Sequence, residues 1–188
     1  MPDNDIAQLY RRPGFMIRRA HQIAVALFLE ETGELGITTT QYGILVLLSQ
    51  QGGIDQVSVA KLLGLDRSTT GMVVQKLEAA GLIGRGIGAH DRRRRSLHLT
   101  RAGEAMLARL AQPAKRAQAR ILSVLAPDER TQFLAMLDKL THSFNGTTRV
   151  PLQARPSAAQ ADAAEPRLAR KRTAKPRTAR GSAQKAKA

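Results

Sequence analysis

The chain has 188 residues and a formal net charge of +15, from 30 Lys and Arg against 15 Asp and Glu, and this excess favours a polyanionic partner such as nucleic acid. It contains no cysteine, which excludes disulfide bonds, thiolate metal sites and thiol-based redox sensing. The longest uninterrupted apolar run, residues 23–29, is too short to span a bilayer and the N-terminus lacks a secretory signal pattern, so we expect a soluble, cytoplasmic protein.

The first third of the chain predicts two helices. Apolar residues recur at helical spacing across residues 16–27, and Gly33 interrupts the pattern soon afterwards. Thr38 and Gln41 have the spacing of a capping box, and the apolar run 44–48 follows them. This second helix is apolar on more than one face, so we expect it to be largely buried.

Two shorter helices separated by a tight turn are predicted next. Asp55 is a suitable N-cap for residues 55–63, and Gly64 suits the left-handed position that ends a helix. Asp66 can cap a further helix over residues 67–80, which a glycine again terminates. A pair of helices joined in this way is typical of a helix-turn-helix.

A β-hairpin is predicted after the helix-turn-helix. Three glycines at positions 84, 86 and 88 are followed by four arginines at 92–95, and residues 96–100 then alternate polar and apolar side chains. We expect a hairpin with a glycine-rich tip that carries the arginines. A run of four arginines is ordinarily a solvated surface, so its position in this hairpin is what favours a role in binding.

Two helices complete the folded part. Thr100 can cap a helix that runs toward Leu125, and Pro113 is expected to kink or interrupt it. Pro127 then occupies the first position of a last helix that extends to Phe144.

The sequence divides into a folded domain at residues 1–148 and a basic tail at residues 149–188. The tail contains 11 basic and 2 acidic residues and few large apolar ones, so it is predicted to be disordered. It resembles the Ala-, Lys- and Pro-rich tails of histone-like proteins. Two interpretations stay open: sequence-independent phosphate contacts that strengthen DNA binding, or an inert solubilising extension.

The order of these elements resembles the multiple-antibiotic-resistance regulator (MarR) family of bacterial transcription factors. The matching segments are residues 65–70, 77–83, 91–93 and 99–103, within a resemblance that covers about residues 10–145. The resemblance implies a mainly α fold with a small β-hairpin wing: a winged helix-turn-helix with N- and C-terminal dimerisation helices. Because one helix-turn-helix covers only a half-site, a homodimer on a palindromic operator is expected.

The candidate DNA-binding residues lie on the second helix of the motif and on the hairpin. Short polar side chains at a helix N-terminus suit phosphate contacts, and Arg or Gln can read base edges. By resemblance, Asp91 orients a wing arginine through an ion pair. Gly71 either permits close approach to DNA or is simply tolerated. The candidates are Arg67, Ser68, Thr69, Thr70, Gln75, Lys76, Asp91, Arg92, Arg93, Arg94 and Arg95.

A small-molecule effector is implied by the same resemblance, because many relatives release DNA when an anionic aromatic compound binds beside the dimerisation helices. The alternative is that the arginines among these candidates are ordinary solvated charges or salt-bridge partners. The candidates for holding a carboxylate, phenol or acyl-CoA phosphate are Arg11, Arg18, Arg19, His21, Phe28 and Tyr42.

The sequence therefore predicts a sequence-specific transcriptional repressor of a nearby operon, released by a small anionic aromatic or acyl-CoA-type effector. The alternative is a nucleoid-associated or architectural protein whose DNA binding depends mainly on the tail. We expect no enzyme, because Ser68, His21 and Asp91 belong to different predicted elements and lack a nucleophile-elbow context. No cofactor is expected, and the four histidines show no metal-ligand spacing.

Overall fold

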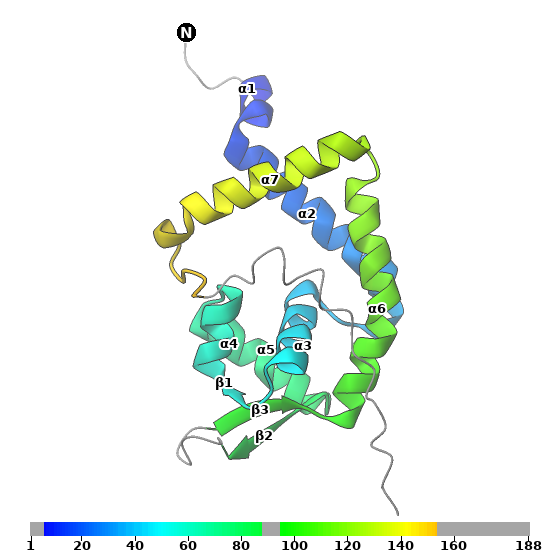
Figure 1. Ribbon diagram of the computed structural model, residues 1–188, viewed down its shortest axis with the longest axis vertical. Coiled ribbons are helices and arrows are strands. Elements are labelled where there is room, and N and C mark those ends of the chain that lie inside the picture. Colours follow the sequence, from blue (N-terminus) through cyan, green and yellow to red (C-terminus); the bar gives the residue numbers. More distant parts are fainter. Residues whose placement is uncertain (1–5, 88–94, 154–188) are drawn as a thin grey trace, which may run out of the picture. The chain divides into compact units, whose positions relative to one another are not determined.

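The computed structural model describes residues 6–87 and 95–153, and its elements follow the predicted order. Figure 1 shows a small sheet at the lower edge of a mostly helical molecule, so the mainly helical fold with a β-hairpin wing is confirmed. The helices are α1 (Ile6–Arg11), α2 (Pro13–Thr32), α3 (Thr39–Gln50), α4 (Gln56–Leu63), α5 (Arg67–Ala79), α6 (Arg101–Leu122) and α7 (Pro127–Ser143), with short 3-10 turns η1 (Gly33–Leu35) and η2 (Asn145–Thr147). The strands are β1 (Ile54–Asp55), β2 (Ile83–Ile87) and β3 (Arg95–Leu99).

The sheet contains a strand that the sequence did not indicate. Its order is β1-β3-β2, and both pairings are antiparallel. The hairpin register places Gly84 opposite His98, and on the other side of β3 Ile54 pairs with Leu97. A two-residue strand is too short to show alternation, so β1 depends on its long-range partner.

Local hydrogen bonds begin the helices where the sequence predicted. The Thr38 Oγ1 accepts the Gln41 backbone N–H at 3.3 Å, and the Gln41 side chain accepts the Thr38 N–H at 2.8 Å. Asp55 caps α4 by accepting the Ser58 N–H at 2.7 Å. At the end of α4, Gly64 adopts a left-handed φ of 63°. These caps confirm the predicted starts of α3 and α4 and the turn before α5.

The main core lies between the helix-turn-helix and the sheet. It joins α3, α4, α5, β3 and α6 through side chains that are almost fully buried. A smaller cluster contains Phe28, Ala114 and Ala117, with Tyr42 packed against it, and so fills the contact between α2, α3 and α6. No described helix combines the length and apolar composition needed to cross a membrane. The main core members are Ile37, Ile44, Leu45, Leu48, Val59, Val74, Leu77, Leu82, Ile83, Leu97 and Leu110.

Helix α6 continues through Pro113, so an interruption there is wrong. Proline removes one backbone donor and costs about 3 kcal/mol or more inside a helix. Packing offsets this cost, because Leu110, Ala114 and Ala117 are buried on either side of the proline. Arg116 also pairs with Glu31 of α2 at 2.7 Å. Tertiary contacts with α2 and α3 therefore hold a helix that local propensity disfavours.

The described part of the chain extends to Gln153, five residues past the predicted domain boundary at 148. In Figure 1, α7 crosses toward the side of α4, and the chain then descends to α4. The Gln153 N–H donates to the Lys61 carbonyl at 3.4 Å. The remaining tail, residues 154–188, lies outside the described residues, and its predicted disorder stays a prediction.

Candidate nucleic-acid interface

One face of α5 is exposed and carries side chains suited to base edges and phosphates. Ser68, Gln75 and Lys76 are all exposed, and helical spacing places them on the same side of the helix. Met72 lies among them and is 58% exposed. Arg67 is exposed in the first turn. We call the surface of Ser68, Met72, Gln75 and Lys76 the α5 face, and a surface of this composition can meet both polar base edges and thymine methyl groups.

The N-terminus of α5 is already occupied by a carboxylate. Asp66 accepts the Thr69 backbone N–H at 2.8 Å and the Thr69 hydroxyl at 2.6 Å. Hydrogen bonding by Thr69, the side chain first, lowers the pKa of Asp66 below its ordinary value of 3.8. The positive end of the helix dipole therefore faces this carboxylate, and the hydroxyl of Thr69 serves the cap.

Thr70 is buried and does not face solvent, contrary to the expectation that it contacts DNA. Its side chain is 0% exposed, and its hydroxyl donates to the Asp66 carbonyl at 2.8 Å. It lies on the side of α5 that also buries Val74 and Leu77. Thr70 therefore belongs to the core side of α5, because its helical position relative to Val74 turns it away from the α5 face.

Gly71 packs against α4. A Cβ at this position would lie 3.4 Å from the Nε2 of Gln56, which is the first residue of α4. A side chain at position 71 would therefore point toward α4. The sequence had suggested only that Gly71 permits close approach to DNA or is simply tolerated, and contact with a neighbouring helix is a third possibility.

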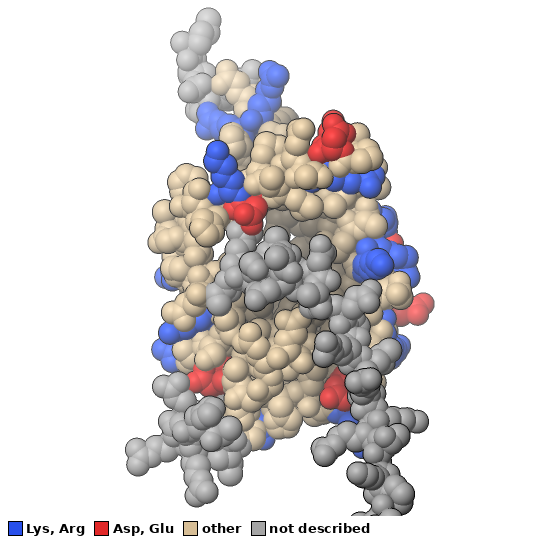
Figure 2. Space-filling view, viewed as in Figure 1, with Lys and Arg blue, Asp and Glu red and all other residues tan. Residues whose placement is uncertain are grey.

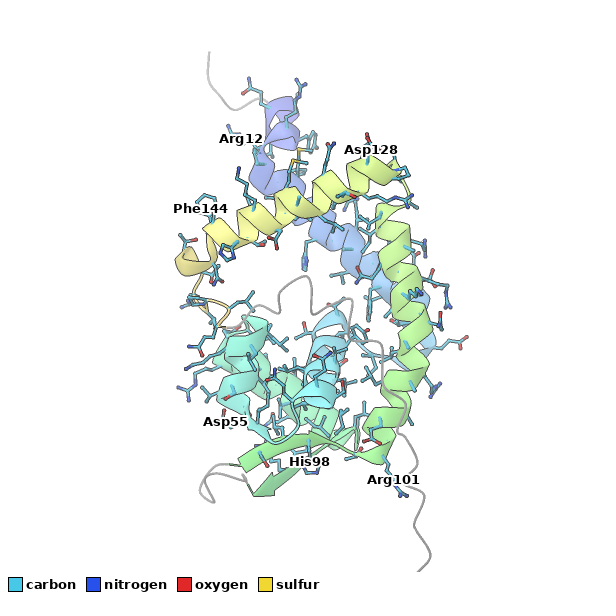
Figure 3. All side chains as sticks on the ribbon, viewed as in Figure 1. Arg12, Asp55, His98, Arg101, Asp128 and Phe144 are labelled. Carbon is cyan, nitrogen blue, oxygen red and sulfur yellow. The ribbon has the colours of Figure 1, made fainter. Side chains whose placement is uncertain are left out.

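The strands of the wing are held against α5. Arg85 on β2 donates through its Nε to both carboxylate oxygens of Glu78, each at 3.0 Å. On the outer side of the hairpin, a Cβ at Gly84 would lie 2.8 Å from the Nε2 of His98, so the glycine makes room for that ring. Figure 3 shows His98 on the sheet. Arg85 thus fixes the base of the wing relative to α5, the second helix of the helix-turn-helix.

The predicted tip of the wing lies outside the described residues. Asp91, Arg92, Arg93 and Arg94 fall between the two described ranges, and Arg95 is described only as the first residue of β3. The register of β2 and β3 nevertheless confirms that residues 88–94 connect two antiparallel strands. Contact between these arginines and DNA stays a prediction.

The candidate effector residues do not form one site within this chain. Phe28 and Tyr42 come together, with ring centroids 5.5 Å apart, and burial raises the pKa of Tyr42. Arg18 stacks on Phe15 at 4.9 Å from its ring. A helical rise of about 1.5 Å per residue puts Arg18 roughly 15 Å along α2 from Phe28. Arg19 and His21 are also exposed on the N-terminal half of α2, and Arg11 is exposed at the end of α1.

A separate hollow of about 550 Å³ lies where α2 meets α6. Its charged lining includes Glu30, Glu31 and Glu34 as well as Arg109 and Arg116. Hydrogen bonds from Arg116 and Arg120 lower the pKa of Glu31. Within the described residues no three His, Asp or Glu side chains group as metal ligands would. The acidic lining makes this hollow a poor match for an anionic effector.

On the face shown in Figure 2, surface charge does not mark a DNA-binding region. In Figure 2 the Lys and Arg side chains lie toward the edges of the view, at the α1 end and along α6. Uncharged side chains cover much of the rest of the described surface in that view. The candidate interface is therefore the α5 face together with the wing.

Comparison with known proteins identifies the family. Residues 35–94, from the end of η1 to the wing, match the MarR family. A protein of Thauera aromatica named for regulation of the hcr operon is 34% identical over 128 residues, which are 68% of this chain and 77% of that protein. The chain belongs to the MarR family. It is therefore a winged-helix transcription regulator, as its sequence predicted.

Solved MarR-type structures share the fold. The transcriptional repressor CouR, solved on a 23-mer DNA duplex, matches with a TM-score of 0.67 and 30% identity over 74% of this chain and 99% of CouR. Another CouR structure contains p-coumaroyl-CoA. Bordetella bronchiseptica BpsR, whose DNA binding is regulated by 6-hydroxynicotinic acid, matches with a TM-score of 0.66 and 28% identity over 70% of this chain and 94% of that one.

Two features of this MarR-type interface were missed from the sequence. Met72 was not selected, although it lies four residues after Ser68 and three before Gln75, a spacing that places it on the same face. The Glu78–Arg85 pair joins a helix to a strand. Its members are seven residues apart with a turn between them, so only the fold brings them together.

Proposed function

We propose that this MarR-family protein is a repressor that binds a palindromic operator as a homodimer, with the α5 face in the major groove and the wing in the adjacent minor groove. The observation that carries this proposal is the exposed row of Ser68, Met72, Gln75 and Lys76 on a helix whose opposite side is buried. Gln and Lys can contact base edges or phosphates, and Met72 can contact a thymine methyl group. CouR, with 99% of its chain matched, was solved on DNA.

The dimer is supported by uncovered apolar side chains on the N-terminal helices α1 and α2 and on and just after α7. Helix α7 has 17 residues and none of them is buried. Figure 3 shows Phe144 at the end of α7, and its side chain is exposed. A second copy that packs on α1, α2 and α7 would remove this surface from water. The exposed apolar residues are Ile6, Leu9, Tyr10, Met16, Ile17, Ile23, Leu29, Leu134, Met136, Leu137, Leu140 and Phe144.

A mobility-shift assay tests the DNA-binding proposal. Full-length protein should prefer its own upstream DNA over scrambled DNA of equal length, and that preference should persist at higher salt. A tail-neutral variant, in which the tail cations become glutamine, should keep it. If the preference disappears with these charges, the architectural alternative replaces the regulator. The changed residues are Arg155, Arg167, Arg170, Lys171, Arg172, Lys175, Arg177, Arg180, Lys185 and Lys187.

Base contact by α5 is tested by Gln75→Ala and Met72→Ala. Gln75→Ala should relax the preference at one operator position by on the order of tenfold, since a good bidentate base contact contributes about 1–3 kcal/mol of discrimination. Met72→Ala should relax the preference for thymine at another position. Ser49→Ala, at an exposed position on α3, is a matched control that should leave the preference unchanged. A uniform loss on all DNA sequences would instead show that these side chains contact phosphates.

We further propose that a small anionic aromatic compound or its acyl-CoA ester binds beside Phe28 and Tyr42 and releases the DNA. BpsR responds to 6-hydroxynicotinic acid and CouR holds p-coumaroyl-CoA. In this chain the partly buried Tyr42 offers a ring and a phenol at the contact between α2 and α3. These two compounds should raise the melting temperature and release operator DNA, and Tyr42→Ala should abolish both effects. No response to either compound would refute this ligand class.

A further inference from the structure

The chain folds back after α7 and forms a segment that we call the brace, residues 145–153. It begins with η2, in which the Thr147 hydroxyl donates to the Phe144 carbonyl at 2.7 Å. Asn145 holds the far end of the brace through both groups of its side-chain amide. Its Nδ2 donates to the Leu152 carbonyl at 3.0 Å, and its Oδ1 accepts the Leu152 N–H at 2.9 Å. Paired donor and acceptor bonds of this kind specify one path for the segment.

The brace contacts the C-terminal end of α4. A Cβ at Gly64 would lie 3.5 Å from the Cγ of Leu152 and 3.5 Å from the Val150 carbonyl oxygen, so the brace lies directly against this glycine. The Gln153 N–H donates to the Lys61 carbonyl at 3.4 Å. Carbonyls in the last turn of a helix lack partners within that helix, so this bond satisfies one of them. The brace therefore covers the end of α4.

The end of α4 leads directly into the helix that carries the α5 face. Gly64 is the C-cap of α4, and Asp66 is the N-cap of α5 two residues later. At its other end α4 follows β1, which pairs with β3, and Figure 3 labels Asp55 there. The sheet therefore holds the start of α4, and the brace contacts its end, where the direction of α5 is set.

The brace begins at the end of α7, a helix that its own chain leaves uncovered. None of the 17 residues of α7 is buried, and the apolar side chains of Leu137 and Leu140 are exposed. This is part of the surface assigned above to the dimer interface. Helix α6 already connects the two regions, since Leu110 is buried in the main core and Ala117 in the smaller cluster. The brace is thus a second connection between the proposed dimer interface and the helix-turn-helix (Figure 1).

We propose that Asn145 and Leu152 are positioning residues for operator recognition: through the brace they hold the turn between α4 and α5 relative to the dimer interface, and so set the spacing of the two α5 helices in the dimer. This inference rests on the proposed function, because it concerns the same palindromic DNA. Half-sites lie about 34–36 Å apart, which is one helical turn of DNA. A second attachment restricts how far the helix-turn-helix can tilt about α6, so less freedom is lost when both half-sites are bound.

The first test compares the natural operator with two operators whose half-sites are one base pair closer or one base pair farther apart. One base pair moves a half-site by about 3.4 Å and turns it by about 35°. Full-length protein should bind the natural operator at least about tenfold more tightly than either altered one. Leu152→Ala and Asn145→Ala should each reduce this spacing ratio to about threefold or less, with the dimer mass and circular dichroism unchanged. A variant that was merely less stable would lose affinity for all three operators equally.

Val124→Ala is the matched control for this test. Val124 is 87% exposed in the turn between α6 and α7, so its truncation removes an apolar side chain near α7 without touching the brace. It should keep the spacing ratio of the full-length protein.

A cross-link provides the converse test, because the chain contains no cysteine. Lys61→Cys and Gln153→Cys place two thiols on exposed residues whose backbones are hydrogen-bonded to each other. In the Asn145→Ala variant, joining these thiols with a short bismaleimide should restore the spacing ratio. Measuring the same protein before and after the reaction removes any effect of the lost Lys61 charge. The reagent should change nothing in Asn145→Ala protein without the thiols.

A spacing ratio that falls in the brace variants and returns with the cross-link supports the inference. An unchanged ratio in both variants overturns it, and so does a cross-link that does not form or that forms without restoring the ratio. Full-length protein that selects its operator but accepts all three spacings equally also overturns it. In these cases operator selection by the full-length protein leaves the proposed function intact. If the full-length protein selects no operator, the proposed function fails and the inference fails with it.

Discussion

Gly103→Ala should destabilise the protein by about 3 kcal/mol, although alanine is the better helix former. A Cβ at Gly103 would overlap the Leu82 carbonyl oxygen and lie 3.1 Å from the Cδ2 of Leu99. The same oxygen accepts the Thr100 N–H at 3.1 Å, and this bond joins the start of α6 to the turn between α5 and β2. Overpacking costs about 1–3 kcal/mol and a lost hydrogen bond about 1, against a helix gain of at most about 1. We use the upper end of the overpacking cost because a backbone oxygen, which cannot move aside as a flexible side chain can, blocks the methyl group.

Urea unfolding followed by circular dichroism measures this loss, at one protein concentration because the proposed dimer makes stability concentration-dependent. Gly71→Ala is the matched control. Its Cβ would meet only the terminal amide of Gln56, so the same change should stabilise the protein by about 0.5–1 kcal/mol. If Gly103→Ala unfolds at the urea concentration of the parent, α6 does not approach Leu82 this closely and the reasoning is wrong.

Two further predictions concern the wing and the cap of α5. Arg85→Ala and Glu78→Gln should each reduce operator affinity by up to about tenfold without unfolding the protein, and the double variant should lose no more than either alone, because both break the same ion pair. Additive losses in a fluorescence-anisotropy titration would contradict a shared role. The lowered pKa of Asp66 means that its carboxylate stabilises the folded state above its ordinary pKa of 3.8 and that this contribution is lost as the pH falls further. Asp66→Asn keeps a capping side chain, so its melting temperature should fall less than that of the parent between about pH 6 and about pH 3; an equal fall would refute the cap.

Short-range features were predictable because both partners lie within one turn of chain. Thr38 with Gln41, Asp66 with Thr69 and Thr100 with Gly103 all form the expected bond across three residues. The hairpin was predictable for a similar reason, since β3 shows its alternation within five residues. Motif order then sufficed for the family and for most of the α5 face.

Long-range partners decided what the sequence left open. Thr70 looked like its polar neighbours until the packing of α5 on the core placed it beside Val74. Helix α6 continues through Pro113 because it packs against α2 and is paired with it through Arg116 and Glu31. Arg85 and Glu78 form their ion pair only because β2 folds back along α5. Leu152 shows the same limit, since nothing near it in the chain indicates that it will pack against Gly64. Hydrogen bonds within a turn depend on local spacing alone, whereas these contacts join residues that chain folding must first bring together, so only the tertiary structure determines them.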